Sequence, residues 1–305
     1  MRHNVDMRIL LTGASGFLGE YIHLLLKTEG HTITTVGRQG SNEIIADLTG
    51  LNLPFKKEFD LVIHAAGLAH TVPLNDKGKQ FFFDVNYTGT ANVLKALENS
   101  IHLRSFIFIS TVAVYGKETG ILIKENEHLL AKDSYGRSKI LAEELIIRWC
   151  TKHKIVCTIL RLPLIAGSNP PGNLHAMIKG VKNGYYFNIA GGKAKKSMVL
   201  AEDVAKILPI AANIGGIYNL TDGYHPSFSE LSESIAKQLT KNKPANIPLW
   251  FANFAAKIGD ILGPKAPINS DKLKKITSDL TFDDSKAREL LGWNPTPVLT
   301  GFKIS

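Results

Sequence analysis

Cysteine is scarce in this sequence, and it has no long apolar run. The chain has two cysteines, Cys150 and Cys157, with no CxxC pair and no histidine cluster at metal-binding spacing. We therefore expect neither a disulfide framework nor a metal site, and a cytoplasmic location suits such a chain. No apolar run reaches the roughly 18 residues that a membrane-spanning helix needs, and the N-terminus lacks the apolar core of a signal peptide.

The richest apolar stretch is residues 247–256, which is too short to cross a bilayer and is followed by Lys257 and Asp260. We expect this stretch to form a covering helix or a lid. A helix that lies on a membrane surface is the alternative.

Positive charge is in excess. The chain has 36 Lys and Arg residues against 27 Asp and Glu residues, a formal net charge of +9. Such an excess can indicate nucleic-acid binding. However, the lysines are scattered, and their short groups at 193–196 and 272–275 contain no aromatic residue. An anionic small substrate such as a diphosphate explains the excess with fewer assumptions, so we expect no nucleic-acid partner.

Short apolar runs alternate with helical patterns in the first half of the chain. The expected strands are residues 7–11, 32–36, 61–64, 106–110 and 155–160, and the expected helices are 17–28, 83–98 and 138–151. Short strands that are apolar throughout are typical of a parallel sheet covered on both faces. With right-handed crossovers, this alternation predicts an α/β fold with a doubly wound parallel sheet of the Rossmann type.

The pattern changes after Arg161. A loop at 169–173 is followed by a short helix, a hairpin-like region at 190–197, a helix at 202–212 and a strand at 216–220. Helical segments then dominate up to residue 291. We assign residues 1–165 to a dinucleotide-binding domain, to which residues 198–222 return. We assign residues 166–197 and 223–305 to a smaller, mostly helical C-terminal substrate domain.

A glycine-rich turn joins the first expected strand to the first expected helix. It contains Gly13, Gly16 and Gly19 in the spacing G-x-x-G-x-x-G, together with Ser15, Phe17 and Leu18. In this context glycines let the backbone approach a pyrophosphate, and the helix N-terminus supplies free N–H groups and a positive dipole end. We expect these six residues to bind a dinucleotide. A tight turn without a ligand is the alternative.

The residue at the end of the second expected strand indicates whether NAD or NADP is bound. An acidic residue there binds the ribose 2′-hydroxyl of NAD, whereas an Arg accommodates the 2′-phosphate of NADP. Gly37 and Arg38 stand at this place, with no acidic residue. We therefore favour NADP over NAD, with an exposed loop Arg as the alternative. Asp47 and Leu48 are expected to contact the adenine edge.

Tyr135 and Lys139 are spaced at i and i+4, on one face of an expected helix. A tyrosine with its ordinary pKa of about 10 is a poor base at neutral pH, and a nearby Lys lowers that pKa by favouring the phenolate. Thr111, at the end of an expected strand, is suited to hydrogen-bond the same substrate oxygen. The three side chains are suited to moving a hydroxyl proton while a hydride is transferred at a sugar carbon. A solvated helix face is the alternative for the Tyr/Lys pair.

These features together resemble the extended short-chain dehydrogenase/reductases, and among them the branch of sugar-nucleotide epimerases and reductases. The resemblance runs through TGASGFLG at 12–19, DL at 47–48, HAAG at 64–67, NYTGTAN at 86–92, STVAVYG at 110–116, YGRSK at 135–139, RLP at 161–163 and LLGWNP at 290–295. It covers nearly the whole chain. It implies that Thr111, Tyr135 and Lys139 are catalytic, and that Lys139 also contacts the nicotinamide ribose.

The resemblance also implies which residues bind the ligands. Besides the glycine turn, the cofactor contacts are expected from Arg38, Asp47, Leu48, Ala65, Ala66, Gly67, Asn86, Ser110, Tyr135, Lys139 and Pro163. Substrate contacts are expected from Thr111, Asn173, Lys196 and Met198. The family often has Arg where Lys196 stands, and Lys lacks the two-pronged hydrogen bonding of a guanidinium. For His64 and Asn86, hydrogen bonds that brace the strands are the alternative role.

Comparison with the branches of this family narrows the expected reaction. Dehydratases place an Asp-Glu pair directly after the catalytic Thr, and enzymes that epimerise C3 and C5 use Cys and His near it. Here Val112 and Ala113 follow Thr111. The resemblance therefore implies hydride transfer at C4 of a UDP-hexose, by a 4-epimerase or a 4-keto-reductase, and Arg38 favours the reductase because NADPH is the usual reducing donor.

Two further expectations follow from the resemblance. Some members of the family have become non-catalytic regulators or RNA-binding proteins, and this is the alternative to an enzyme. Extended members often form homodimers through two helices, which here are residues 86–98 and 138–151.

Overall fold

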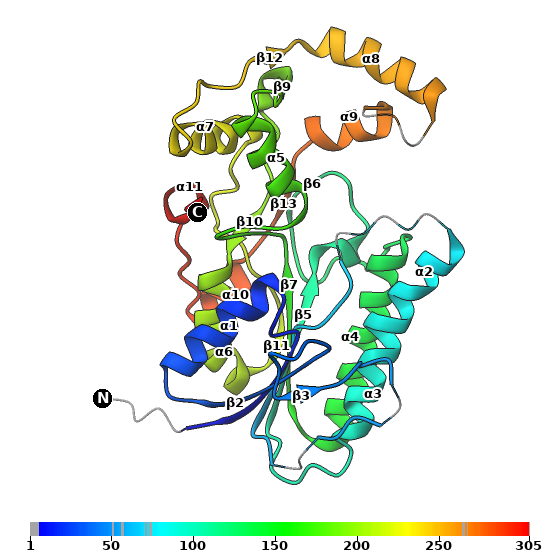
Figure 1. Cartoon of the computed structure of the whole chain (residues 1–305), viewed down its shortest axis with the longest axis vertical. Coiled ribbons are helices and arrows are strands. Elements are labelled where there is room, and N and C mark those ends of the chain that lie inside the picture. The colour runs from blue at the N-terminus through cyan, green and yellow to red at the C-terminus, as the bar shows by residue number, and fades with distance from the viewer. Residues whose placement is uncertain are drawn as a thin grey trace.

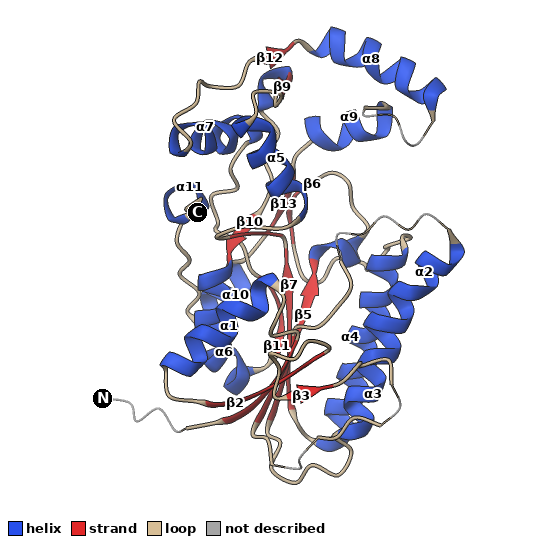
Figure 2. Cartoon of the chain, in the orientation of Figure 1, coloured by secondary structure: helices blue, strands red, loops and turns tan. Residues whose placement is uncertain are grey.

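The computed structural model describes residues 6–50, 52–55, 58–69, 71, 73, 75–263, 266 and 268–304. A central sheet with helices on both sides makes up the lower part of the view in Figure 1. Helices and short strands from the C-terminal half stand above the sheet, as the colouring by secondary structure also shows (Figure 2).

The central sheet has seven parallel strands. They are β1 (Arg8–Thr12), β2 (Thr32–Gly37), β3 (Ile44–Ile45), β4 (Leu61–His64), β5 (Ser105–Thr111), β7 (Val156–Leu162) and β11 (Gly216–Asn219). Their order is β11-β7-β5-β4-β1-β2-β3, so the chain begins in the middle, extends to one edge and then returns to build the other. This doubly wound arrangement confirms the predicted fold class.

Burial explains why these strands are apolar without alternation. Every residue of β4 is buried, and in β5 only the last residue, Thr111, is partly exposed. Helices α1 (Phe17–Thr28), α6 (Ala201–Ile214) and α10 (Ser285–Leu291) pack on one face of the sheet. Helices α2 (Asp76–Phe83), α3 (Gly89–Ala96) and α4 (Ser134–His153) lie on the other side (Figure 1). Both faces are therefore withdrawn from water.

The remaining elements come mostly from the C-terminal half. Three two-stranded parallel pairs are β8 (Leu164–Ala166) with β10 (Met198–Leu200), β9 (Asn188–Ile189) with β12 (Asn246–Ile247), and β6 (Gly120–Ile123) with β13 (Leu280–Phe282). The helices are α5 (Gly172–Lys182), α7 (Phe228–Gln238), α8 (Leu249–Leu262), α9 (Ser270–Thr277) and α11 (Val298–Gly301). The division into domains at residues 165, 198 and 222 stays a prediction.

Two segments differ from their expected structure. The hairpin expected at 190–197 is wrong: a 3₁₀ turn η3 (Ala190–Gly192) is followed by an isolated bridge from Lys195 to Ser227, so the partner comes from a distant segment. The single helix expected at 83–98 is interrupted by a π-helix, η1 (Asp84–Thr88), which joins α2 to α3. Such wider turns are frequent at functional sites.

Candidate functional site

The glycine turn connects β1 to α1 at the carboxyl edge of the sheet. Gly13 has a φ of +76°, and a Cβ there would lie 2.6 Å from the backbone nitrogen of Ala66. A Cβ at Gly19 would lie 2.0 Å from the carbonyl oxygen of Gly13. Gly16 is the N-cap of α1 and makes no side-chain cap. The turn thus leaves open backbone at a helix N-terminus, which fits the pyrophosphate of a dinucleotide.

The other residues of the turn differ in how they face the solvent. Ser15 is exposed, and the ring of Phe17 packs edge-on against Tyr21 with the ring centroids 5.6 Å apart. The side chain of Leu18 is buried in the core between α1 and the sheet. Only the backbone of Leu18 is therefore available to a ligand.

Ala65, Ala66 and Gly67 follow β4 and lie beside the glycine turn. The Ala65 N–H donates to the Thr12 carbonyl at 3.2 Å, and the Ala66 N–H donates to the Thr12 hydroxyl oxygen at the same distance. A Cβ at Gly67 would lie 3.2 Å from Nζ of Lys139. The segment therefore joins the expected dinucleotide turn to one of the expected catalytic residues.

His64 is buried and braces β4 against its neighbours. The Thr90 hydroxyl donates to the Asn86 carbonyl, so it accepts from Nε2 of His64 at 2.9 Å. Nδ1 of His64 then accepts from the Thr12 hydroxyl at 2.6 Å. Burial and the nearby charge of Lys139 lower the pKa of His64 to about 3, so the ring is neutral. These hydrogen bonds brace the strand, which is the alternative role expected for His64.

Asn86 lies in the π-helix η1 and fixes the chain that follows Gly67. Its amide oxygen accepts from the Leu68 N–H at 2.7 Å, and its amide nitrogen donates to the Leu68 carbonyl at 3.2 Å and to the Ser138 hydroxyl at 2.9 Å. The Ser138 hydroxyl donates in turn to the carbonyl of Tyr135 at 2.8 Å. Asn86 therefore links the expected cofactor segment to the helix that carries the Tyr/Lys pair.

Arg38 directly follows β2, and Asp47 and Leu48 follow β3. Arg38 and Asp47 are exposed, and the charge of Arg38 contributes to lowering the pKa of Asp47, after the larger effect of a backbone hydrogen bond from Thr49. The Leu48 carbonyl accepts from the side chain of Asn92 at 2.9 Å. A guanidinium and a carboxylate are thus near each other where the adenosine half of a dinucleotide is expected.

The structure brings Thr111 and Tyr135 together. Thr111 ends β5, where its hydroxyl oxygen accepts from the Ala113 N–H at 3.2 Å. Tyr135 lies in the first turn of α4, which is capped by a hydrogen bond from the Gly136 N–H to the Asp133 carboxylate at 2.9 Å. The Thr111 side chain is close enough to Tyr135 to lower the pKa of the phenol. Two hydroxyl groups therefore meet at the carboxyl end of a central strand.

The pKa of Tyr135 differs from the sequence expectation. Burial of the phenol raises its pKa above the ordinary value, and the Thr111 side chain opposes that rise. Lys139 was expected to lower this pKa, but it is not among the groups that shift it. The physical reason is that the ammonium group of Lys139 is directed toward β5, where it donates to the Ile109 carbonyl at 2.9 Å.

Lys139 is buried one helical turn after Tyr135. Its Nζ lies 4.4 Å from the ring centroid of Phe108 as well as 2.9 Å from the Ile109 carbonyl. Burial lowers the pKa of Lys139 to about 8, and the carboxylate of Glu143 counteracts part of that effect. With this pKa the ammonium group is mostly protonated at neutral pH, and its position next to Gly67 suits contact with hydroxyl groups of a ligand.

A buried polar network lies under these three residues, and sequence reasoning missed it. The guanidinium of Arg161 on β7 forms an ion pair with Glu143 on α4 at 2.7 Å and donates to the Tyr115 hydroxyl at 3.1 Å. Ser110, which was expected to bind cofactor, donates its hydroxyl to the same Glu143 carboxylate. The available signal was a charged Arg161 inside an apolar strand, which requires a buried counterion.

Three of the four expected substrate residues lie together, apart from Thr111. Asn173, Lys196 and Met198 line one cavity of about 40 Å³, together with Leu164, Leu174, Met177, Pro226, Phe228 and Leu231. Pro163 lies between β7 and β8, directly after the residue that pairs with Thr111. It therefore connects the end of β7, which pairs with Thr111, to this cavity.

Lys196 is held by the end of α9. Its ammonium group donates to the carbonyls of Lys275 and Ser278, both at 2.9 Å. Burial lowers the pKa of Lys196. Because an ammonium group has three N–H donors, one donor remains for a ligand after these two bonds.

The comparisons with known proteins agree with this geometry. The model of the NAD dependent epimerase/dehydratase family matches residues 9–220, more than half of the chain. The chain belongs to this family. The match includes the glycine turn, the Tyr/Lys pair and the last strand of the central sheet, and it confirms the resemblance inferred from the motifs.

Two curated relatives of this family member are 4-epimerases. The UDP-glucose 4-epimerase of Vibrio cholerae is 27% identical over 97% of this chain and 93% of its own length. The N-acetyl-alpha-D-glucosaminyl-diphospho-ditrans,octacis-undecaprenol 4-epimerase of Escherichia coli O157:H7 is 28% identical over 91% of this chain and 88% of its own. These similarities support a sugar-nucleotide epimerase of the NAD-dependent family.

Solved structures share the fold and were determined with either cofactor. RMD from Pseudomonas aeruginosa complexed with NADPH has a TM-score of 0.71 at 20% identity, covering 96% of this chain and 95% of that one. The UDP-glucose 4-epimerase of Thermus thermophilus in complex with NAD has a TM-score of 0.72 at 20% identity, covering 95% and 94%.

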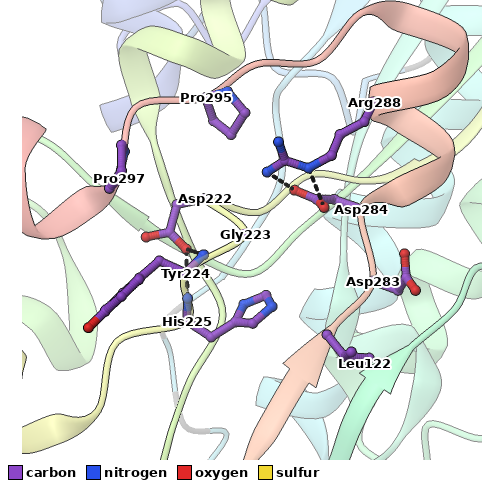
Figure 3. A pocket seen from close by; sticks show the side chains of 10 residues that line it. All are labelled: Leu122, Asp222, Gly223, Tyr224, His225, Asp283, Asp284, Arg288, Pro295 and Pro297. Atoms are coloured by element: carbon purple, nitrogen blue, oxygen red, sulfur yellow. Dashed lines mark hydrogen bonds and ion pairs between the residues drawn. The ribbon is translucent and has the colours of Figure 1, made fainter.

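A larger cavity of about 580 Å³ is lined by other residues, which Figure 3 shows. Its polar side chains are engaged within the protein. Asp222 accepts from the backbone N–H groups of Tyr224 and His225, and Arg288 is paired with Asp284 at 2.9 Å. The Thr221 hydroxyl donates to the Asp284 carboxylate at 3.0 Å, which ties the loop after β11 to the start of α10, so we assign this cavity a structural role. Within the described part of the chain, no helix is long and apolar enough to cross a membrane.

Proposed function

We propose that this family member is an NAD(P)-dependent 4-epimerase of a UDP-hexose. The observation that carries the proposal is the placement of the Thr111 side chain next to Tyr135, with the ammonium of Lys139 one helical turn away. These groups lie at the carboxyl edge of the same sheet as the glycine turn, which is where open α/β sheets bind their ligands.

Each of the three residues has a separate role in this proposal. Tyr135 takes the proton of the C4 hydroxyl group and later returns it. Thr111 hydrogen-bonds the same substrate oxygen and fixes its position. Lys139 holds the ribose hydroxyls of the dinucleotide through its ammonium group. A bound nicotinamide dinucleotide supplies hydride chemistry at the sugar carbon.

The substrate end of the site is proposed from a second set of residues. Asn173 and Lys196 line one cavity with Met198, and the free N–H of the Lys196 ammonium suits a diphosphate oxygen. For the cofactor, Arg38 supports NADP, while the carboxylate of Asp47 near it opposes a phosphate. We therefore propose that both cofactors bind, with NADP favoured.

The experiment uses purified full-length protein with UDP-glucose or UDP-N-acetylglucosamine and measures the C4 configuration of the product by NMR. We expect interconversion of the C4 epimers without net consumption of cofactor. Stoichiometric consumption of NADPH with a UDP-4-keto sugar, and no epimerisation, would instead establish the 4-keto-reductase. Absence of both reactions in protein that binds NAD(P) would favour a non-catalytic regulatory or RNA-binding role.

A sugar carried by a lipid diphosphate is a second candidate substrate. The Escherichia coli relative is named for such a substrate, and the exposed apolar side chains of α8 in this chain favour it. The homodimer expected through residues 86–98 and 138–151 remains a proposal, which light scattering coupled to gel filtration tests directly.

A further inference from the structure

Helix α8 exposes large apolar side chains at the end of the molecule farthest from the central sheet (Figure 1). Seven large apolar residues of α8 are exposed, namely Leu249, Trp250, Phe251, Phe254, Ile258, Ile261 and Leu262. Exposure reaches 71% for Trp250 and 87% for Ile261. Single exposed apolar residues are ordinary on protein surfaces, but seven on one helix of 14 residues form a patch.

The packed face of α8 is made of small residues. Ala252, Ala256 and Gly259 are buried against α9 and its preceding loop. The fit is close, because a Cβ at Gly259 would lie 1.8 Å from the Ile268 carbonyl oxygen. The helix therefore attaches to the protein through its smallest side chains and directs its largest ones outward.

The outward residues occupy one arc of the helix. With 100° per residue, six of the seven apolar side chains fall within about 120°, and Leu249 lies outside this arc. Asn253, Lys257 and Asp260 form a polar stripe next to that arc. This is the pattern of a helix that lies in an interface with its apolar arc in one medium and its polar stripe in water.

The surrounding segment is strongly basic. Residues 237–277, from the last turn of α7 to the end of α9, contain eight lysines and two aspartates, with no Arg or Glu. One of the two aspartates, Asp260, is engaged by Ser270, whose hydroxyl donates to it at 2.6 Å. In the sequence, residues 237–277 thus carry +6 of the formal +9; among their lysines, Lys243 and Lys275 form ion pairs with Glu233 and Glu118.

We propose that α8 docks the protein on an anionic lipid bilayer. The apolar arc inserts at the boundary between headgroups and acyl chains, and the lysines of residues 237–277 contact the anionic headgroups. A second copy of this chain is a poorer occupant, because a symmetric contact through α8 would bring two such basic segments together.

Docking at α8 places the bilayer near the candidate substrate cavity. α8 packs on α9, and the end of α9 holds Lys196 through the carbonyls of Lys275 and Ser278. One helix therefore separates the docking surface from a residue that lines the cavity. The docking itself is measured without substrate, so its outcome is independent of the proposed activity.

Tryptophan emission gives a direct measurement. The chain has three tryptophans, and Trp149 and Trp293 are only 9% and 4% exposed, against 71% for Trp250. Full-length protein is titrated with vesicles of phosphatidylcholine alone, or of equal parts phosphatidylcholine and phosphatidylglycerol. We expect the emission to move to shorter wavelength with the anionic vesicles, and the protein to sediment with them.

Variants separate docking from its reporter. Trp250→Phe should abolish the shift and retain sedimentation. Phe254→Ser/Ile258→Ser/Ile261→Ser should weaken vesicle binding by about 100-fold or more, since each buried apolar side chain contributes roughly ten-fold or more.

Leu24→Ser/Ile210→Ser is the matched control, because it removes two exposed aliphatic side chains from α1 and α6. This control should bind vesicles like the wild type. Failure of the wild type to bind anionic vesicles, or equal losses in the triple variant and the control, would overturn the proposal. So would a dimer without vesicles that the triple variant converts to a monomer.

Discussion

Replacing Lys139 by Met tests whether the buried ammonium group of Lys139 destabilises the folded protein. Burial lowers the pKa of Lys139 from 10.5 to about 8. Because one pKa unit corresponds to about 1.4 kcal/mol, the buried charge disfavours folding at pH 7 by about 3 kcal/mol. Lys139→Met removes that cost and also the hydrogen bond to the Ile109 carbonyl and the contact with the Phe108 ring, about 1 kcal/mol each. We expect the variant to be about 1 kcal/mol more stable at pH 7.

The pH dependence gives the sharper test. Between pH 8 and 10.5 the unfolded chain still binds the proton that folded Lys139 has lost, so raising the pH favours the folded wild type. Between pH 7 and 9.5 the free energy of unfolding of the wild type should therefore rise by about 2 kcal/mol relative to Lys139→Met. Other titrating groups cancel in the comparison of the two proteins.

Urea unfolding followed by circular dichroism at both pH values measures this difference. Lys95→Met is the matched control, because Lys95 is exposed on α3 and its loss should give no such pH dependence. A difference between wild type and Lys139→Met that stays constant with pH, or that moves toward the variant at high pH, would refute the reasoning.

Three other substitutions test the site and its support. Tyr135→Phe should lower turnover by about 10²- to 10⁴-fold and leave NAD(P)H binding nearly unchanged, as measured by nicotinamide fluorescence; unaltered turnover would remove Tyr135 from its proposed role. Arg38→Ala should weaken NADP binding by about ten-fold or more and NAD binding much less, and equal losses in calorimetric titrations of both cofactors would contradict the phosphate contact. Arg161→Met leaves Glu143 buried without its partner, so it should cost about 3–5 kcal/mol and lower the melting temperature by about 6–15 °C. Its control is Arg148→Ala, which removes an exposed partner of Glu144 and should cost at most about 0.5 kcal/mol; similar melting shifts in both would contradict a buried pair.

The sheet could be predicted from the sequence because its strands are buried on both faces. β4 begins with three apolar residues and β5 has four in a row at 106–109, and such runs without alternation are typical of strands covered on both faces. The pairing of β6 with β13 had no comparable signal, since the two short strands are far apart in the chain and neither has a regular alternation. The isolated bridge from Lys195 to Ser227 escaped prediction for the same reason.

The parts of the candidate site that depend on local spacing were predicted from the sequence, and the parts that depend on contacts between distant segments were not. The spacing of Tyr135 and Lys139 on one helix is a local property, and the motif after β5 added Thr111. The partner of Arg161 was not predictable, because Glu143 lies on α4 and only the packing of that helix on β7 brings them together. The outward face of α8 escaped prediction too, since apolar periodicity reports which residues share a face and leaves open which face is packed.

The electrostatics of the site explain what a destabilising buried charge at Lys139 can contribute to ligand binding. The carboxylate closest to serving as its counterion is Glu143, whose oxygens already bond Arg161 and Ser110. The ammonium therefore meets mainly uncharged groups, the Ile109 carbonyl and the Phe108 ring. A buried cation with only partial compensation is poised to stabilise an anion that arrives or develops beside it. The phenol of Tyr135 lies one turn away and is kept neutral by burial, and Lys139 does not shift its pKa, so the anion that Lys139 is placed to stabilise is one brought by a ligand.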